Sequence, residues 1–253
     1  MTATWRPLSF FDTARTITFD LTFPVPHGST TLSLGNTDER FGDANETALS
    51  REMLYSTCRM GTDHAVRMKV EHGVKISIVD DGPGGIFCDG LITRRRGIPL
   101  SVGTADCVPL MVTDRAQSIV GLIHVSRHNS APGSSGRAGI IEEMISVFQS
   151  MGVYPGELVV LLGPSLRQCH YTFPEQASLV AARLQSLGVP RRQISAVDVC
   201  TFHSVDVRHG GFLFPSHRRV DNAQKQKRVV RGNRFVPERE ARFETAVMLP
   251  EET

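Results

Sequence analysis

Two apolar runs separated by a short polar stretch constrain the fold of this chain more than any other feature. Residues 104–130 read TADCVPLMVTDRAQSIVGLIHVSRHNS, in which Cys107 stands at the start of one apolar run and His124 at the end of the next. Each run has the length and the bounding polar residues of a strand. The pair therefore predicts two antiparallel strands joined by a tight turn.

The hairpin places two chemically reactive residues close together. If Arg115 and Ala116 form a two-residue turn, Cys107 at the start of the first strand lies directly opposite His124 at the end of the second. Directly opposed residues of an antiparallel pair have Cβ atoms about 4.5–5.5 Å apart. That spacing allows one thiolate and one imidazole to share a metal ion or to exchange a proton.

Three interpretations of this cysteine and histidine remain open. Both could be core residues, because free cysteine is among the most buried residue types. They could bind a metal ion together with a third ligand, for which His72 is the natural candidate because it lies at a break between two strands and precedes a glycine. Cys107 could also be a metal-free nucleophile with His124 as its base. The spacing does not separate the last two interpretations.

The rest of the chain alternates short strands and helices without repeats. The helix expected at 45–60 begins with Asn45 as N-cap and ends before Gly61. This mixture of hairpin-like and helix-connected strands predicts a single α+β domain over residues 1–253, with mixed sheets and helices packed outside them. The basic stretch within 221–253 is expected to be a partly disordered tail. Further strands are expected at 29–35, 65–70, 74–79, 88–93, 98–103, 157–163 and 194–201, and further helices at 137–152 and 174–188.

Composition excludes several classes of protein. The chain has 253 residues and a net charge of +2, which is ordinary for a globular protein with its own core. The sequence has no run of about 18 apolar residues, so no membrane span is expected. The N-terminus does not resemble a secretory signal. Five scattered cysteines are typical of a reducing cytoplasm rather than a disulfide framework. The basic stretch lacks interleaved aromatic residues, so no specific nucleic-acid partner is expected.

The residues around the hairpin resemble those of a known family. TADCVPLMV at 104–112, a strand ending in His124, the pair His72-Gly73 and DGLIT at 89–93 are similar to the laccase-domain family of purine nucleoside phosphorylases. Its members are also called multicopper polyphenol oxidases or peptidoglycan editing factors. The resemblance covers most of residues 30–220 and includes SLG at 33–35, Gly42-Asp43, Arg51, Gly163-Pro164-Ser165, Cys200-Thr201 and SHRR at 216–219.

The resemblance implies a fold, a metal and an activity. The fold is a layered α/β/β/α arrangement, and zinc is bound by His72, Cys107 and His124. Copper is the less favoured metal, because multicopper chemistry needs many more clustered histidines. The implied protein is a transferase or hydrolase that cleaves or deaminates purine nucleosides, with nucleoside and phosphate as its small-molecule partners. One alternative is a metal-free cysteine hydrolase or deamidase that uses Cys107 and His124. The other is a non-catalytic small-molecule binding protein or a divergent enzyme of a specialised biosynthetic pathway.

Four residues are expected to take part in catalysis. Cys107 and His124 belong to the cluster, and Arg51 is carried over from the first helix of the family. Glu71 stands where the family usually has glutamine; it could accept a hydrogen bond near the metal ligands, act as a general base, or be a solvated strand residue. The nearby Asp89 is expected to shape its turn through side-chain hydrogen bonds.

This chain departs from the family directly after the second histidine. The family usually has Ala-Gly-Trp-Arg-Gly where this chain has Val-Ser-Arg-His-Asn at 125–129. We expect substrate contacts from Arg127, His128 and Asn129, together with Ser165 of the Gly-Pro-Ser turn. A family segment after that turn is absent, so one wall of the usual pocket is expected to be either missing or supplied by another chain. A homodimer is therefore one expected assembly.

Overall fold

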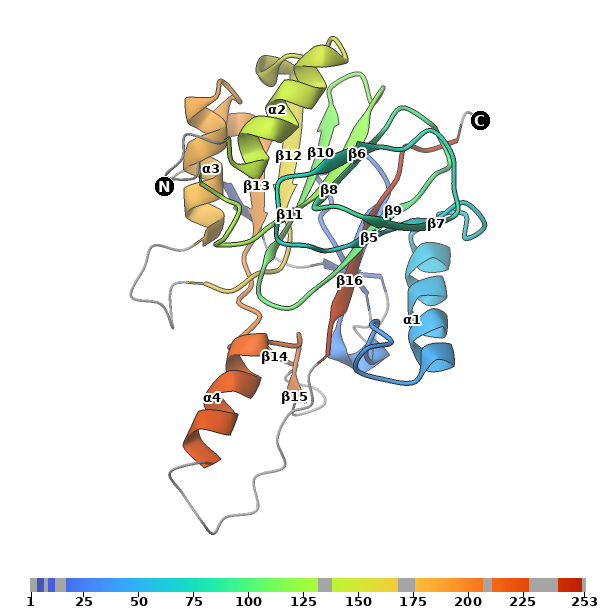
Figure 1. Ribbon diagram of the computed structural model, residues 1–253, viewed down its shortest axis with the longest axis vertical. Coiled ribbons are helices and arrows are strands. Elements are labelled where there is room, and N and C mark those ends of the chain that lie inside the picture. Colours follow the sequence, from blue (N-terminus) through green and yellow to red (C-terminus); the bar gives the residue numbers. More distant parts are fainter. Residues whose placement is uncertain are drawn as a thin grey trace.

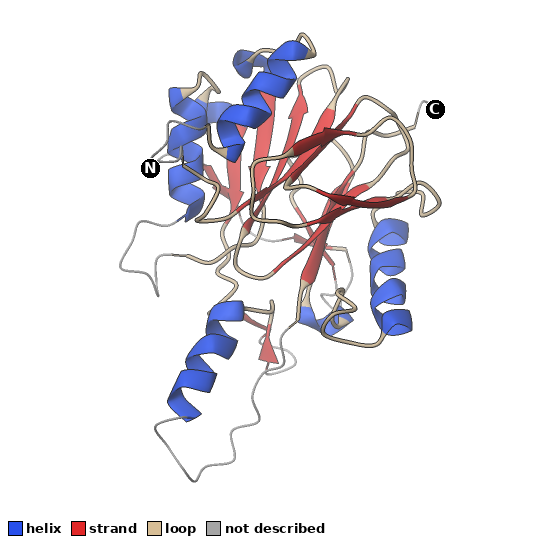
Figure 2. Ribbon diagram, viewed as in Figure 1, coloured by secondary structure: helices blue, strands red, loops and turns tan. Residues whose placement is uncertain are grey.

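Two mixed β-sheets stacked between helices form the core of the protein (Figure 2). The structure is a computed structural model that describes residues 4–6, 9–11, 17–131, 138–167, 176–206, 211–227 and 241–251. Each of the two large sheets has seven strands. The predicted α+β class with mixed sheets is confirmed.

The first sheet contains the predicted hairpin at its centre. Its antiparallel pairs are β10 with β11, β10 with β12 and β11 with β8, whereas β12 with β13, β1 with β13 and β6 with β8 are parallel. In sheet order the strands are β1 (Thr4–Arg6), β13 (Ile194–Val197), β12 (Leu158–Leu162), β10 (Val108–Asp114), β11 (Val120–Val125), β8 (Gly90–Thr93) and β6 (Ile76–Ile78).

The second sheet combines strands from both ends of the chain with three strands from its middle. In sheet order the strands are β2 (Ser9–Phe10), β3 (Ile17–Phe19), β4 (His27–Thr30), β16 (Phe243–Val247), β9 (Leu100–Thr104), β5 (Val66–Lys69) and β7 (Gly84–Phe87). A separate two-stranded ribbon pairs β14 (Val205–Asp206) with β15 (Gly211–Phe212).

The helices cover the outer faces of the two sheets. Helices α2 (Ile140–Ser150) and α3 (Gln176–Ser186) lie on one side of the molecule, and α1 (Ala44–Thr57) lies on the opposite side (Figure 1). Helix α4 (His217–Lys227) extends away from this layered body, next to β14 and β15. The order of layers is therefore α/β/β/α, as predicted.

Three hydrophobic clusters fill the spaces between the layers. In β10, Leu110 and Val112 pack towards α2 and α3, whereas Met111 packs between the sheets. Both faces of β10 and β11 are thus covered, which explains why these strands are continuous apolar runs. The predicted helical spacing of α2 is confirmed, since its buried residues are Ile140, Ile141, Met144, Ile145 and Phe148.

The predicted register of the hairpin is wrong by two residues. His124 pairs with Pro109, and the ladder ends with Thr113 opposite Val120. The turn is longer than Arg115 and Ala116 because the carboxylate of Asp114 accepts hydrogen bonds from the backbone N–H groups of Ser118 and Ile119. Cys107 therefore lies just before the ladder instead of directly opposite His124.

Helix α1 begins and ends differently from the prediction. Its N-cap is Asp43 rather than Asn45, and the Asp43 side chain accepts from the N–H groups of Asn45 and Glu46. It ends at Thr57, and Arg59 adopts the left-handed conformation expected of a glycine at 61. The expected strand at 29–35 is divided between the end of β4 and a 3-10 turn, Leu32–Leu34.

The expectation of a tail over 221–253 is wrong for its described parts. Residues up to Lys227 belong to α4, and β16 is a fully buried strand between β4 and β9 in the second sheet. The apolar residues of β16 pack on both faces of the sheet, so β16 is a core strand. The charged sequence before it led to the wrong prediction of a tail. Residues 228–240 lie outside the described residues.

Candidate metal centre

The structure brings His72, Cys107 and His124 together. One ligand atom from each residue lies within 4.8 Å of those of the other two. His72 follows β5 of the second sheet, His124 lies in β11 of the first sheet, and Cys107 directly precedes β10 of the first sheet. The cluster therefore forms only when the two sheets are packed together. His124 is buried and His72 is exposed, so the cluster is open to solvent on one side.

A single buried carboxylate, that of Asp89, positions both histidines. Its Oδ1 accepts from His124 Nδ1 at 2.8 Å and from the backbone N–H of His72 at 2.9 Å. Its Oδ2 accepts from the N–H groups of Glu71 at 3.2 Å and Gly73 at 2.8 Å. Asp89 is fully buried and directly precedes β8. The expected backbone role of Asp89 is thus observed, and the bond to His124 is an addition to it.

These hydrogen bonds explain two unusual features of the histidines. His72 has a φ of 61°, in the left-handed region that non-glycine residues rarely adopt, and the three N–H bonds of its turn to Asp89 maintain that conformation. Because His124 Nδ1 is bonded to Asp89, its Nε2 is left to face Cys107. Carboxylates commonly orient histidine ligands of metals in this way.

Cys107 and His124 favour their charged forms in the metal-free cluster. Burial would raise the pKa of Cys107, but hydrogen bonds from His124 and His72 outweigh burial and lower it to about 7. Burial would lower the pKa of His124, but its hydrogen bonds with Asp89 and Cys107 raise it to about 9. A thiolate is the form of cysteine that binds a metal ion or attacks an electrophile.

The donor set fits a metal ion with an open position. Two nitrogen atoms and one thiolate are the usual ligands of zinc, and three protein ligands leave a fourth position for water or substrate. A tetrahedral zinc site needs ligand atoms roughly 3.3–3.7 Å apart. The observed limit of 4.8 Å therefore requires only small side-chain movements to close around an ion.

Two side chains of the altered loop lie at the open side of the cluster. The ring centroids of His128 and His72 are 6.3 Å apart, and Arg127 Nε donates to His128 Nε2 at 3.1 Å. Both residues are exposed, as is Glu71 beside His72. These three residues can therefore reach a molecule that approaches the cluster from solvent.

Asn129 lies inside the protein instead. Its amide Nδ2 donates to the carbonyl oxygens of Gly73 and His124, and its Oδ1 accepts from the Ser126 N–H at 2.7 Å. The side chain is buried and ties the turn of one histidine to the strand of the other. Its hydrogen-bonding groups are used in holding the site.

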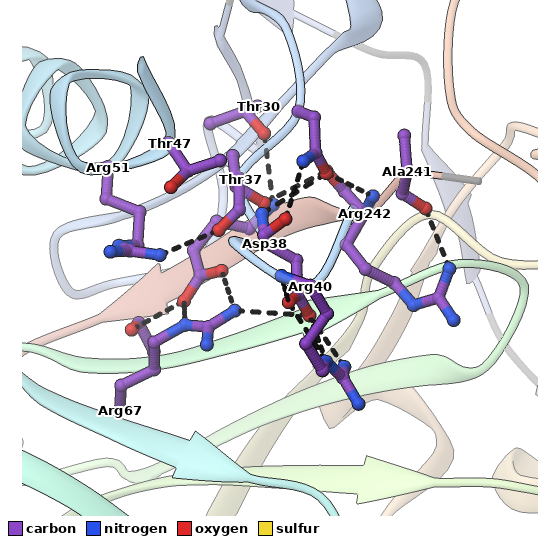
Figure 3. Close-up of polar contacts among 12 residues, drawn as sticks. Thr30, Thr37, Asp38, Arg40, Thr47, Arg51, Arg67, Ala241 and Arg242 are labelled. Atoms are coloured by element: carbon purple, nitrogen blue, oxygen red, sulfur yellow. Dashed lines mark hydrogen bonds and ion pairs between the residues drawn. The ribbon is translucent and has the colours of Figure 1, made fainter. Parts of the chain in front are cut away.

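The contacts of Ser165 and Arg51 place neither residue at the open side of the cluster. Ser165 is buried and forms an isolated β-bridge with Cys200. Arg51 donates to the carbonyl oxygen of Thr37 at 2.8 Å in a separate polar network (Figure 3). That network also contains the buried pair of Arg67 with Glu244 and links α1 to β16 through the loop at 36–41.

The fold and the cluster define an α/β/β/α protein with a candidate His-Cys-His metal centre. A model of the family described as "Multi-copper polyphenol oxidoreductase laccase" matches residues 28–179. This match covers more than half of the chain, and the chain belongs to this family. The resemblance predicted from the sequence is thereby confirmed. None of the described helices is long and apolar enough to cross a membrane.

Individual relatives carry a common name. A purine nucleoside phosphorylase of Deinococcus radiodurans is 29% identical over 176 residues, which are 65% of this chain and 65% of that protein. The purine nucleoside phosphorylase ORF3 of Streptomyces griseus is 32% identical over 118 residues, 45% of each chain. The chain thus spans about two thirds or less of these curated relatives. The crystal structure of YlmD from Geobacillus stearothermophilus has a similar fold, with a TM-score of 0.74, 21% identity, and 96% and 99% of the two chains covered.

Proposed function

We propose that this protein is a zinc-dependent enzyme that acts on a purine nucleoside or a related small polar metabolite. The observation that carries the proposal is the group of His72, Cys107 and His124, two imidazoles and a thiol with an exposed side. The names of the relatives support nucleosides as the substrate class and phosphate as a second substrate. Phosphorolysis, hydrolysis and deamination are the three candidate reactions.

Zinc is the proposed metal, although the family description names copper. Multicopper chemistry needs more histidines in one place than the single three-residue group found among the described residues. When bound, zinc would lower the pKa of a water molecule towards about 7 or polarise a leaving group. Cytoplasm is the proposed compartment, because the described cysteines Cys58, Cys88 and Cys107 are free thiols, as is usual under reducing conditions.

The protein's own residues divide the work around the cluster. Asp89 holds His124 in one tautomer and keeps the turn of His72 in place. Arg127 and His128 offer cationic and imidazole N–H groups to a phosphate or ribose oxygen at the open side. Glu71, exposed beside His72, is the candidate base for a substrate proton. We assign Asn129 and Ser165 to holding the backbone, and Arg51 to the network beneath α1.

Metal analysis and product analysis together test the proposal. Untagged protein should contain close to one zinc per chain, and His124→Ala should abolish binding. Incubation with adenosine, inosine or guanosine in the presence of inorganic phosphate distinguishes the reactions. Free base with ribose 1-phosphate indicates phosphorolysis, free base with ribose indicates hydrolysis, and inosine from adenosine indicates deamination. A zinc-loaded protein that turns over none of these substrates would refute the proposed activity. If a nucleoside binds without turnover, the protein is a binding protein instead.

A second candidate function uses the same residues without a metal. The interaction of Cys107 with His124 favours a thiolate and an imidazolium, the pair found in cysteine hydrolases and deamidases. Metal-free protein that is rapidly labelled at Cys107 by an electrophilic substrate analogue, and that remains active in excess chelator, would establish this alternative. Light scattering of purified protein would test whether a homodimer completes the site.

A further inference from the structure

Asp106, the residue directly before Cys107, joins the cysteine to three segments that are distant in the sequence. Its backbone carbonyl accepts from the N–H of Leu166 at 2.9 Å. Its carboxylate oxygens accept from the Thr201 hydroxyl at 2.7 Å and from the N–H of Arg218 at 2.8 Å. Its φ of 85° is in the left-handed region, so these contacts maintain a conformation that an aspartate rarely adopts alone.

The three segments are also joined to one another without Asp106. The N–H of Thr201 donates to the carbonyl of Ser165 at 3.1 Å, beside the bridge between Ser165 and Cys200. Arg219 of α4 is buried, and its guanidinium donates to the carbonyl oxygens of Thr201, Phe202 and Phe214. Asp106 therefore attaches the turn of Cys107 to a unit that other contacts already hold together.

Cys107 needs such an attachment more than the two histidines do. It precedes the first ladder residue of β10, so strand pairing does not fix its backbone. His124, by contrast, lies within the paired part of β11 and is bonded to Asp89. The turn of His72 is held by three N–H bonds to the same aspartate. The remaining ligand depends on the residue that precedes it.

We propose that Asp106 is a positioning residue that holds Cys107 in place for metal binding and couples the metal centre to the first turn of α4. The coupling follows because one carboxylate accepts the Arg218 N–H of that turn and lies next to the thiol ligand. A ligand that orders the Cys107 turn must then also order the start of α4, and the reverse holds by linkage. This inference rests on the proposed metal centre.

Asp106→Asn tests the inference with a matched control. The variant keeps the shape of the side chain but replaces one of the two acceptor oxygens by a donor. Zinc affinity, measured by chelator competition, should fall roughly 10- to 100-fold, and the sulfur-to-metal band of the cobalt-substituted protein should change. Asp43→Asn makes the same chemical change at the N-cap of α1, where Asp43 Oδ1 accepts two N–H bonds, and should leave both readouts unchanged.

Two further measurements separate positioning from a merely structural role. Thr201→Val removes only the hydroxyl donor and should weaken zinc binding in the same direction by less. Zinc should slow hydrogen exchange at the Arg218 amide of the wild-type protein but not of Asp106→Asn. If Asp106→Asn lowers the melting temperature and yet binds zinc with wild-type affinity and spectrum, Asp106 is only a helix cap and the proposal is overturned.

Failure of this inference can be distinguished from failure of the proposed metal centre. If the wild-type protein binds no zinc, alkylation of Cys107 is measured well above its pKa, where the rate reports access to the thiolate. A released turn in Asp106→Asn should then react severalfold faster than the turn in wild-type or Asp43→Asn protein. Equal rates in all three proteins would overturn the positioning role regardless of the metal.

Discussion

Replacing Asp89 by asparagine should weaken metal binding and also destabilise the fold. Each carboxylate oxygen of Asp89 accepts two hydrogen bonds, so four donors converge on this one buried side chain. An asparagine amide has a single acceptor oxygen, and its NH2 group can only donate. Whichever way the amide is turned, its NH2 group faces two donors and two hydrogen bonds are lost.

The size of the effect follows from which two bonds are lost. A hydrogen bond to a charged group contributes about 1.5–3 kcal/mol, so the loss of two should lower the free energy of unfolding by about 3–6 kcal/mol. If the NH2 group takes the place of Oδ1, it faces His124 Nδ1 and the N–H of His72; in the other orientation it faces the turn around His72. In either orientation, His72 or His124 loses hydrogen bonds that hold it in place. Zinc affinity should therefore fall roughly 10- to 100-fold.

A second buried aspartate provides the control for this experiment. Asp114 lies at the turn of the same hairpin and accepts from the N–H groups of Ser118 and Ile119 and from the Ser118 hydroxyl. Asp114→Asn should therefore also lower the urea midpoint, but it should leave zinc affinity unchanged. Wild-type zinc affinity in Asp89→Asn, or an equal loss of affinity in both variants, would refute the role of Asp89.

Three further predictions concern pH, the buried ion pair and the metal. Alkylation of Cys107 in metal-free protein should accelerate as pH rises through about 7 and then level off, because the thiolate reacts; a midpoint near the ordinary 9.0 would contradict the lowered pKa. Glu244→Gln should lower the free energy of unfolding in urea by about 3 kcal/mol. This is the low end for breaking a buried ion pair, because the Arg67 side chain is 23% exposed. Unchanged stability would count against the network. Removal of zinc by a chelator should lower the melting temperature of wild-type protein but not of Cys107→Ser; equal melting of both wild-type forms would exclude stabilisation by the metal.

The grouping of His72, Cys107 and His124 could be predicted from the sequence although the hairpin geometry could not. Residue types and positions made these three residues candidates, and the resemblance to the family implied that they act together. The register failed because it depends on turn chemistry, and the side chain of Asp114 stabilises a turn longer than two residues. The cluster survives this shift because Cys107, in the loop before the ladder, can still approach the ring of His124.

The residues that position the ligands were harder to predict, since their roles depend on contacts between distant segments. Asp89 lies 35 residues before His124, and Asn129 is bonded to Gly73, 56 residues earlier. A D-G turn before a strand indicates only local backbone hydrogen bonds. Similarly, a polar loop residue such as Asn129 suggests substrate contact until its partners are known. Asp89 and Asn129 are buried, whereas Arg127 and His128 are exposed, and this difference separates their roles.

The C-terminal strand offers the sharpest test of the fold, because the sequence predicts a tail there. Phe243 is fully buried between the two sheets, pairs with Thr104 and contacts the ring of Phe214 at a centroid distance of 5.2 Å. Phe243→Ala should lower the free energy of unfolding by about 3–5 kcal/mol, as expected for an aromatic residue removed from a core. Leu21→Ala is the control, since that side chain is 77% exposed and its loss should change stability by no more than about 0.5 kcal/mol. Equal urea midpoints for the two variants would mean that β16 is not part of the second sheet. The turn of Cys107 follows β9, which pairs with β16, so the support of the metal centre from that sheet would then be lost as well.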